Sequence, residues 1–205
     1  MDRAGDGHAA AVREQIEASA ALKRALLDQT DIILQIANQL VEAFRRGNKV
    51  LLFGNGGSAA DAQHIAAEMA GKLYFDREPL PAIALTVNTS SLTAIANDYD
   101  YQQVFARQLK GLATKGDVAV GISTSGNSRN VIAAVEEAKR KGLVTVAFVG
   151  QGGRLSQIAD YVLSVPSSDT PRVQEAHITA GHIICYLVEK ELFSGRQSSS
   201  SPGPK

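Results

Sequence analysis

Residues 54–71, which read GNGGSAADAQHIAAEMAG, decide the fold of this chain. They follow residues 50–53 (VLLF), an apolar run typical of a buried strand. Gly56 and Gly57 permit a sharp turn because glycine tolerates positive φ angles, and Ser58 is predicted to cap the helix that follows. A strand that passes through a glycine turn into a helix N-terminus commonly binds an anion. The stretch therefore predicts an α/β fold with an anion site at this turn.

His64 and Glu68 stand four residues apart on the predicted helix, so their side chains project from the same face. An imidazole and a carboxylate together can bind a metal ion or exchange protons with a substrate. A solvated surface pair is the ordinary alternative. The alanines around the pair have small side chains and indicate that the helix is closely packed, which favours a functional role.

The composition is that of one globular domain. The chain has 205 residues, 44% of them apolar, and its 21 basic residues balance 21 acidic ones. This balance gives no reason to expect binding to nucleic acid or to a membrane surface. No apolar run approaches the ~20 residues that span a bilayer, and the N-terminus lacks a signal-peptide pattern. Cys185 is the single cysteine, so we expect no disulfide within the chain and a cytoplasmic location.

From residue 49 onward, strand patterns alternate with helix patterns. This alternation predicts a doubly wound fold, in which helices cover both faces of a parallel sheet. The last two apolar runs are continuous, as in strands that are buried on both faces. The predicted strands are 49–53, 82–86, 117–122, 143–149 and 161–165. The predicted helices after the first strand are 58–71, 91–96, 101–113, 128–141, 153–159 and 172–193.

The N-terminal part, from residue 9 to about residue 46, has the pattern of two long helices. Their apolar faces exceed what the sheet of one subunit is expected to cover, which favours oligomerisation through these helices. Residues 1–8 are polar and glycine-rich and are expected to be disordered. Residues 194–205 are of low complexity and are expected to form a disordered tail. We therefore expect a single domain over residues 9–193.

A second polar loop, residues 123–128 (STSGNS), follows the predicted strand at 117–122 and precedes a helix. Ligands of open parallel sheets bind beyond the carboxyl ends of the strands, where this loop and the glycine turn are both expected. Hydroxyl and backbone N–H groups at a helix N-terminus can hold a phosphate without Lys or Arg. Turn formation alone explains one or two of these residues but not the run of six. We therefore expect a phosphate site here.

Taken together, these motifs resemble those of the phosphoheptose isomerases, a family with the sugar isomerase (SIS) fold. The resemblance covers residues 10–193. It implies a flavodoxin-like SIS fold with a five-stranded sheet, a homotetramer assembled through the two N-terminal helices, and one zinc ion per subunit. The matching segments are 55–58 (NGGS), 60–68 (ADAQHIAAE), 93–99 (TAIANDY), 123–128 (STSGNS) and 172–182 (RVQEAHITAGH).

The resemblance also implies roles for individual residues. The implied zinc ligands are His64, Glu68, Gln174 and His182, and the implied acid–base pair is Glu68 and His182. The phosphate is expected on Ser123, Thr124, Ser125 and Ser128. The rest of the sugar is expected against Asn55, Gly56, Gly57, Ser58, Asn97 and Asp98, with Glu68 and Gln174.

The implied reaction converts sedoheptulose 7-phosphate to D-glycero-D-manno-heptose 7-phosphate through an enediol, toward ADP- or GDP-heptose for surface glycans. Such an isomerase needs a base, an acid and a group that stabilises the oxyanion, and Glu, His and zinc can supply these. One alternative is a non-catalytic SIS protein that binds the replication initiator protein, and another is a sugar-binding regulatory module beside a DNA-binding domain. Gly57, Glu68 and His182 favour the enzyme, and 205 residues leave no room for a DNA-binding domain.

Gln174 and His182 present a geometric difficulty for a shared zinc ion. They are eight residues apart, which is about 12 Å along an ideal helix, and their directions differ by about 80°. Either the helix is irregular near Gln174 or the ligands come from different subunits. His177 is expected at a helix surface or an interface, and Cys185 is expected to be a packed apolar residue.

Overall fold

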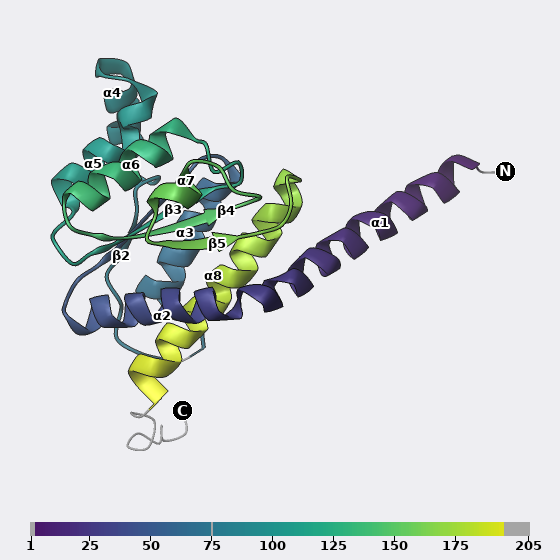
Figure 1. The fold of residues 1–205 in the computed structure, drawn as a ribbon, viewed down its shortest axis with the longest axis horizontal. Helices are drawn as coiled ribbons and strands as arrows, with labels where there is room; N and C mark the ends of the chain where they lie inside the picture. The colour runs from purple at the N-terminus through teal and green to yellow at the C-terminus, as the bar shows by residue number, and fades with distance from the viewer. Residues whose placement is uncertain (1–2, 75, 195–205) are drawn as a thin grey trace, which may run out of the picture.

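Five parallel strands form one sheet at the centre of the molecule (Figure 1). The structure is a computed structural model that describes residues 3–74 and 76–194. The strand order β2-β1-β3-β4-β5 is that of the flavodoxin-like doubly wound folds, so the predicted fold class is confirmed. The strands are β1 (Val50–Gly54), β2 (Ala82–Ala84), β3 (Val118–Ser123), β4 (Val144–Val149) and β5 (Tyr161–Ser164).

Helices cover both faces of this sheet because neighbouring residues of a strand point to opposite sides. Leu52 belongs to the core under one layer of helices, whereas its neighbour Leu51 belongs to the core under the other. The first layer contains α2 (Thr30–Arg45), α3 (Gly57–Ala70) and α8 (Thr170–Phe193). The second contains α4 (Thr89–Asp98), α5 (Val104–Leu112), α6 (Arg129–Arg140) and α7 (Leu155–Ile158). Two short 3-10 helices, η1 (Leu26–Gln29) and η2 (Tyr101–Gln103), precede α2 and α5.

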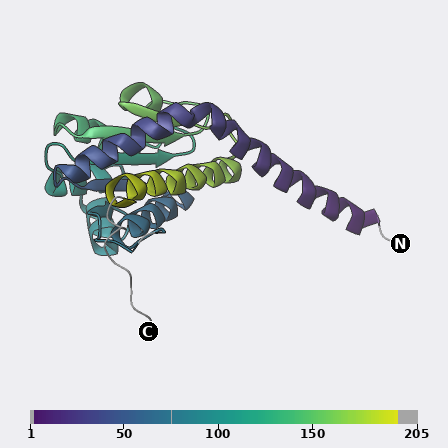
Figure 2. The same ribbon diagram turned by 90° about the horizontal axis from the view of Figure 1, so that it is seen from below.

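Helix α1 (Arg3–Ala25) projects away from the rest of the domain (Figures 1 and 2). It begins inside the segment 1–8 that was predicted to be disordered, so that boundary is wrong from residue 3 onward. The alanines around its two first glycines have the highest helix propensity of all residues, which explains why the helix continues toward the N-terminus. Residues 1–2 and 195–205 of the two predicted disordered ends lie outside the described residues.

The apolar stripe of α1 is left uncovered by its own domain. Val12 and Ile16, one helical turn apart, are 59% and 63% exposed. Among residues 3–74 and 76–194, no helix combines the length and apolar character that a membrane span requires. Apolar side chains exposed in a row, such as Val12 and Ile16, are typical of contact surfaces, which is consistent with the expected role of α1 in oligomerisation.

Helices α3 and α8 pack side by side and run in the same direction. At the start of the pair, the side chain of Gln174 lies against Gly57. Beyond the end of α3, the backbone N–H of Leu73 donates to Glu189 on α8. Helix α8 is an unbroken α-helix from Thr170 to Phe193, so the proposed irregularity near Gln174 is not observed.

Candidate active site

The glycine turn after β1 starts α3 one residue earlier than predicted. Gly56, with a φ of 53°, is the N-cap residue, and no side chain caps the helix there. Ser58 lies in the first turn and is buried, so its predicted role as the N-cap is wrong. The positive φ of Gly56 directs the chain into helical geometry before Ser58 is reached. The N–H groups of the first helical turn have no intrahelical acceptor, which suits them to an anion.

The hydroxyl loop after β3 brings three serine side chains together. The Oγ atom of Ser123 lies 2.8 Å from that of Ser128 and 3.4 Å from that of Ser125. Ser123 is buried at the end of β3, Thr124 is half-buried and Ser125 is exposed. Helix α6 begins directly after Ser128. Hydroxyl donors and a helix N-terminus therefore face one place, which is the arrangement expected of a phosphate cradle.

The two loops lie side by side because β1 and β3 are neighbours in the sheet. Gly54 at the end of β1 pairs with Ile122 in β3. Since β2 lies beyond β1 and β4 lies beyond β3, this is the point where the strand order reverses, the usual ligand site of such sheets. The structure therefore brings two separate motifs of the sequence, the glycine turn and the hydroxyl loop, together at the carboxyl ends of β1 and β3.

Asn130 joins the two loops, although the sequence did not single it out. Its side-chain amide exchanges two hydrogen bonds with that of Asn55: Asn55 Nδ2 donates to Asn130 Oδ1 at 2.9 Å, and Asn130 Nδ2 donates to Asn55 Oδ1 at 2.8 Å. The hydroxyl of Tyr101 also donates to Asn55 Oδ1, at 3.3 Å. The available signal was an Asn two residues beyond Ser128, at a predicted helix start.

His64, Glu68 and His182 form a cluster, with ligand atoms that lie within 4.8 Å of one another. The Nε2 atoms of His64 and His182 are 2.8 Å apart, and His64 Nε2 is 3.4 Å from Glu68 Oε1. The two imidazole rings meet edge to face. Half of the His64 side chain and about a fifth of the Glu68 side chain are exposed (49% and 21%), so small molecules and ions can reach them. We call these three residues the His–Glu–His cluster.

Gln174 of the same chain lies elsewhere. Its side-chain amide contacts Gly57 so closely that a Cβ at that position would overlap it. Gly57 lies seven residues before His64 on α3, a distance of about 10 Å along the helix. Because α8 is regular, Gln174 and His182 also remain two turns apart. Within one chain, the structure therefore joins three of the four predicted zinc ligands and places the fourth beside the glycine turn.

Asn97 and Asp98 lie at the end of α4, where both are exposed. Asn97 Nδ2 donates to Asp98 Oδ1 at 2.9 Å. This segment approaches the glycine turn through Tyr101, which follows three residues later and bonds to Asn55. The pair therefore lies on the same side of the molecule as the two loops, and its polar groups are exposed.

Comparisons with known proteins agree with this geometry. Residues 15–150 match the model of the SIS domain. The phosphoheptose isomerase of Aneurinibacillus thermoaerophilus is 49% identical over 189 residues, which cover 90% of this chain and 96% of that protein. The phosphoheptose isomerase of Sulfurimonas denitrificans is 53% identical over 186 residues, covering 89% of this chain and 95% of that protein. The chain belongs to the phosphoheptose isomerases of the SIS-domain family.

Solved structures of this family have the same fold as the chain. A phosphoheptose isomerase from Neisseria gonorrhoeae superimposes with a TM-score of 0.81 and 41% identity, over 91% of this chain and 98% of that one. A phosphoheptose isomerase from Francisella tularensis gives a TM-score of 0.86 and 34% identity, over 89% of this chain and 98% of that one. The expected membership of the family is confirmed.

In this member of the family, Asp61 is a further polar group beside the His–Glu–His cluster. It lies on α3, three residues before His64, and is half-buried. Its Oδ2 atom is buried and has no hydrogen-bond partner among the described residues. Burial raises the pKa of this carboxyl group from 3.8 to about 6, and the nearby His64 lowers it in part. The sequence indicated Asp61 only as part of a cap.

His177 and Cys185 of α8 are both core residues. His177 is fully buried, with its Nε2 atom 3.1 Å from the backbone oxygen of Val149, so its prediction as a surface or interface residue is wrong. Burial lowers the pKa of His177 to about 4. The face of α8 that carries it covers the sheet, which periodicity alone did not distinguish from the exposed faces. Cys185 is packed as expected, and burial raises the pKa of its thiol to about 12.

Proposed function

We propose that this member of the phosphoheptose isomerases interconverts sedoheptulose 7-phosphate and D-glycero-D-manno-heptose 7-phosphate, a step toward ADP- or GDP-heptose. The observation that carries the proposal is the His–Glu–His cluster, in a chain that is 49% and 53% identical to phosphoheptose isomerases. The product would serve surface glycans, as the family resemblance implies. Each part of the site has a chemical task in this reaction.

The hydroxyl loop is the proposed phosphate site. Ser123, Ser125 and Ser128 cluster there through their Oγ atoms, and residues 123–128 include no Lys or Arg. Neutral hydroxyl and N–H donors at the start of α6 can bind the phosphate, aided by the positive end of the helix dipole. Thr124 is the fourth proposed donor. The glycine turn (Asn55, Gly56, Gly57 and Ser58), with Asn97 and Asp98, is the proposed site for the sugar hydroxyls.

Glu68 and His182 are the proposed acid–base pair. In the ketose-to-aldose direction, a carboxylate takes a proton from C1 while an acid protonates the carbonyl oxygen at C2, which gives an enediol. The proton returns to C2, and the hydroxyl at C1 loses its own proton and becomes the aldehyde. We assign the carbon proton to Glu68 and the oxygen protons to His182. Both side chains lie in one cluster, so one bound substrate can contact the two.

The cluster also fits a zinc ion. Two imidazole nitrogens and a carboxylate oxygen are common zinc donors, and here they converge from two helices. Each histidine turns its Nε2 atom toward the same point, where the two nitrogens lie 2.8 Å apart. A zinc ion held there by His64, Glu68 and His182 would act as a Lewis acid toward the substrate carbonyl. The fourth proposed ligand, Gln174, would come from another subunit.

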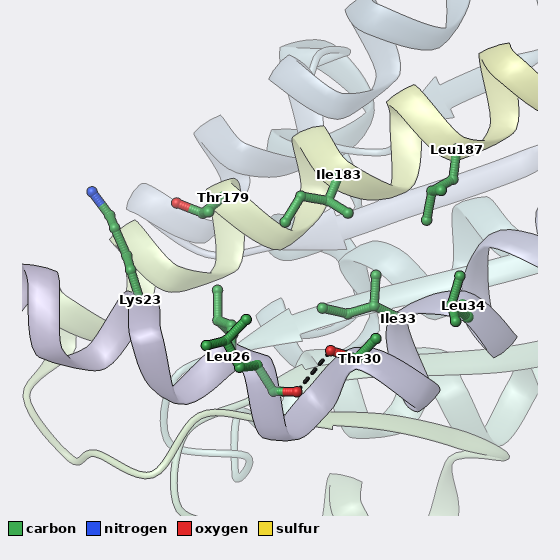
Figure 3. A pocket seen from close by; sticks show the side chains of 9 residues that line it. Lys23, Leu26, Thr30, Ile33, Leu34, Thr179, Ile183 and Leu187 are labelled. Atoms are coloured by element: carbon green, nitrogen blue, oxygen red, sulfur yellow. Dashed lines mark hydrogen bonds between the residues drawn. The ribbon is translucent and has the colours of Figure 1, made fainter.

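A homotetramer with shared sites is therefore part of the proposal. An apolar groove lies between η1–α2 and α8 (Figure 3). Ile183, the neighbour of His182, lines the groove, and Leu27 at its other side is 74% exposed. Surface of this kind, together with the apolar stripe of α1, is typical of subunit contacts. A second chain in this groove would lie next to the cluster and could bring Gln174 to it.

An assay of purified protein on sedoheptulose 7-phosphate tests the proposed function. We expect formation of the aldose phosphate, loss of activity after treatment with a chelator, and recovery on addition of Zn²⁺. Glu42→Gln on α2, where the carboxylate forms an exposed ion pair with Arg45, is a control that should retain full activity. A well-folded protein that converts no substrate with or without Zn²⁺ would refute the proposal.

The alternative functions have less support. The relatives described above carry the name of an isomerase, and they do not support a non-catalytic protein that binds a replication initiator. A cytoplasmic location remains our expectation, and it is supported by a single, buried and unpaired cysteine, which suits a reducing compartment.

A further inference from the structure

A buried ion pair lies at the end of the α3–α8 contact. Arg77, in the loop after α3, places its Nε atom 2.9 Å from Oε1 of Glu189 on α8, and the two side chains are only 2% and 0% exposed. Burial of two charges costs free energy unless each forms several hydrogen bonds. The partners of these two residues therefore indicate what the pair is for.

Arg77 binds the last turn of α3. Its Nη2 atom donates to the backbone oxygen of Glu68 at 2.8 Å, and its Nη1 atom donates to that of Met69 at 2.9 Å. Carbonyls in the last turn of a helix lack intrahelical donors, and a cation is favoured at this end of the helix dipole. The planar guanidinium group thus holds the residue that supplies the carboxylate of the His–Glu–His cluster, by its backbone. A lysine has no such fork of donors.

Glu189 binds the same segment from α8. Its Oε1 atom accepts from the N–H of Leu73 at 3.1 Å, and its Oε2 atom accepts from the N–H of Tyr74 at 2.7 Å. Glu189 follows His182 by seven residues, so the two side chains leave the same face of α8. The face that supplies the second histidine of the cluster is therefore also the face that is attached to the end of α3.

The two helices touch directly at the level of the cluster. Gly181 precedes His182, and Ile65 follows His64. A Cβ at Gly181 would lie 2.8 Å from Cδ1 of Ile65, so the helices approach as closely as a glycine allows. Close contact at Gly181 sets the distance between the helices at this level, and the contact of Gln174 with Gly57 holds their N-terminal ends. The attachment at Arg77 and Glu189 fixes their C-terminal ends, which are the ends nearer to Glu68.

We infer that Arg77 and Glu189 are positioning residues, which hold Glu68 and His64 on α3 opposite His182 on α8. The inference rests on the proposed function of the cluster, because it states how the acid–base pair and the zinc donors are kept in register. Both side chains are buried, so neither is placed to touch a substrate. Their role is to fix the geometry that the metal and the proton transfers require, as residues behind metal ligands commonly do.

Two variants test this, Glu189→Gln and Arg77→Lys. Each retains the approximate size of the side chain and disrupts the network. We expect Zn²⁺ affinity, measured by competition with a chromophoric chelator, to fall about 10- to 100-fold. We expect kcat to fall by a similar factor while KM for the sugar phosphate changes less than about threefold, because the loops are untouched. The absorption spectrum of the Co²⁺-loaded protein should also change, since it reports ligand geometry.

Asp117→Asn and Glu191→Gln are matched controls. Asp117 is a buried carboxylate that pairs with Lys49 at 2.7 Å and accepts backbone N–H bonds, but it lies just before β3 and bonds to residues 49 and 114, not to α3 or α8. Glu191 is on α8, two residues beyond Glu189, in an exposed pair with Arg45. Asp117→Asn should lower the melting temperature without changing Zn²⁺ affinity or the Co²⁺ spectrum. Glu191→Gln should change neither.

The outcomes separate the inference from the proposed function. Suppose that the unaltered protein binds Zn²⁺ and is active. If the two variants then match Asp117→Asn in Zn²⁺ affinity, kcat and Co²⁺ spectrum, the Arg77–Glu189 pair is merely structural and the inference is wrong. If the unaltered protein is inactive, the proposed function itself fails. If Glu189→Gln alone does not fold, the double variant Arg77→Gln/Glu189→Gln, which leaves no buried charge unpaired, takes its place with the same expected losses.

Discussion

The two halves of the proposed site differ in how the chain builds them. The proposed anion-binding loops, residues 55–58 and 123–128, are runs of consecutive residues that each join a strand to a helix. The His–Glu–His cluster instead joins His64 to His182 across 118 residues. Each loop is one continuous segment, although Asn130 joins the two, whereas the cluster depends on how α3 and α8 pack. Changes in the loops should therefore alter substrate binding, and changes around the cluster should alter turnover and metal binding.

Glu68→Gln should have the largest effect, because it removes the proposed base while retaining the shape of the side chain. We expect kcat to fall about a thousandfold with little change in melting temperature. The measurement is steady-state kinetics beside thermal unfolding, with Glu42→Gln as the control. A kcat within a factor of a few of the unaltered enzyme would remove Glu68 from the mechanism and leave the loops as the better-supported half of the site.

Mixing two inactive chains tests whether the cluster is completed across subunits. One chain would carry Gln174→Ala and the other His182→Ala, and the subunits would be allowed to exchange. If Gln174 reaches the cluster of another chain, roughly a quarter of the sites in a random mixture would have both residues intact, and activity should return to that extent. A pair that carries Glu68→Gln and His182→Ala should stay inactive, since the structure places these residues in one chain. Verified exchange without recovery in the first pair would contradict a shared site.

Ser125→Ala tests the loop half of the comparison. Loss of one neutral donor should raise KM about tenfold, equivalent to about 1.4 kcal/mol, and leave kcat nearly unchanged. Zn²⁺ affinity should not change, because the serine belongs to the other half of the site. A substrate analogue without the phosphate should bind far more weakly to the unaltered enzyme. Equal binding of the analogue and the ester would argue against the phosphate cradle.

Asp61→Asn should have the smallest effect, and it concerns stability. Because burial raises the pKa of Asp61 to about 6, the folded state favours the protonated form of this side chain. The contribution of Asp61 to the free energy of unfolding is therefore lost as pH rises from about 4 to 6. This pKa shift would correspond to about 3 kcal/mol of unfolding free energy if the carboxyl group were fully buried. Since the side chain is half-exposed, we expect the amide to stabilise the metal-free protein by about 1 kcal/mol at pH 7.5.

The measurement for Asp61 is urea unfolding of the chelator-treated protein at several pH values. The variant should lose the dependence on pH between 4 and 6. Asp117→Asn is the opposite control: hydrogen bonds from Lys49, Thr114 and Asn48 together hold the pKa of Asp117 below its usual value despite burial, so its loss should destabilise the protein at neutral pH. A stability of Asp61→Asn equal to or lower than that of the unaltered protein would contradict the stated cause.

Local signals in the sequence predicted the loops well and the assembly of α8 poorly. The strand–glycine–helix pattern at residues 54–71 is local, so it could be recognised before any packing was known. The sequence predicts His177 at a surface, whereas the residue is buried. Periodicity shows that a helix has two faces but does not show which of them covers the sheet. The sequence predicts Ser58 as the cap, whereas Gly56 holds that position, because the positive φ angle of Gly56 is a property of the folded turn. Asn130 belongs to the site through its amide pair with Asn55, a contact across 75 residues that no local pattern indicates.

The sequence by itself predicted the alternation of strands and helices, the two proposed anion-binding loops and the pairing of His64 with Glu68, because each of these signals lies in residues near one another in the chain. It also carried the motifs by which the family was recognised. Only the tertiary structure decided that His182 joins that pair while Gln174 lies beside Gly57. It alone revealed that Arg77 and Glu189 attach α3 to α8. The physical reason is that side-chain packing between distant helices depends on their relative position, which no local pattern specifies.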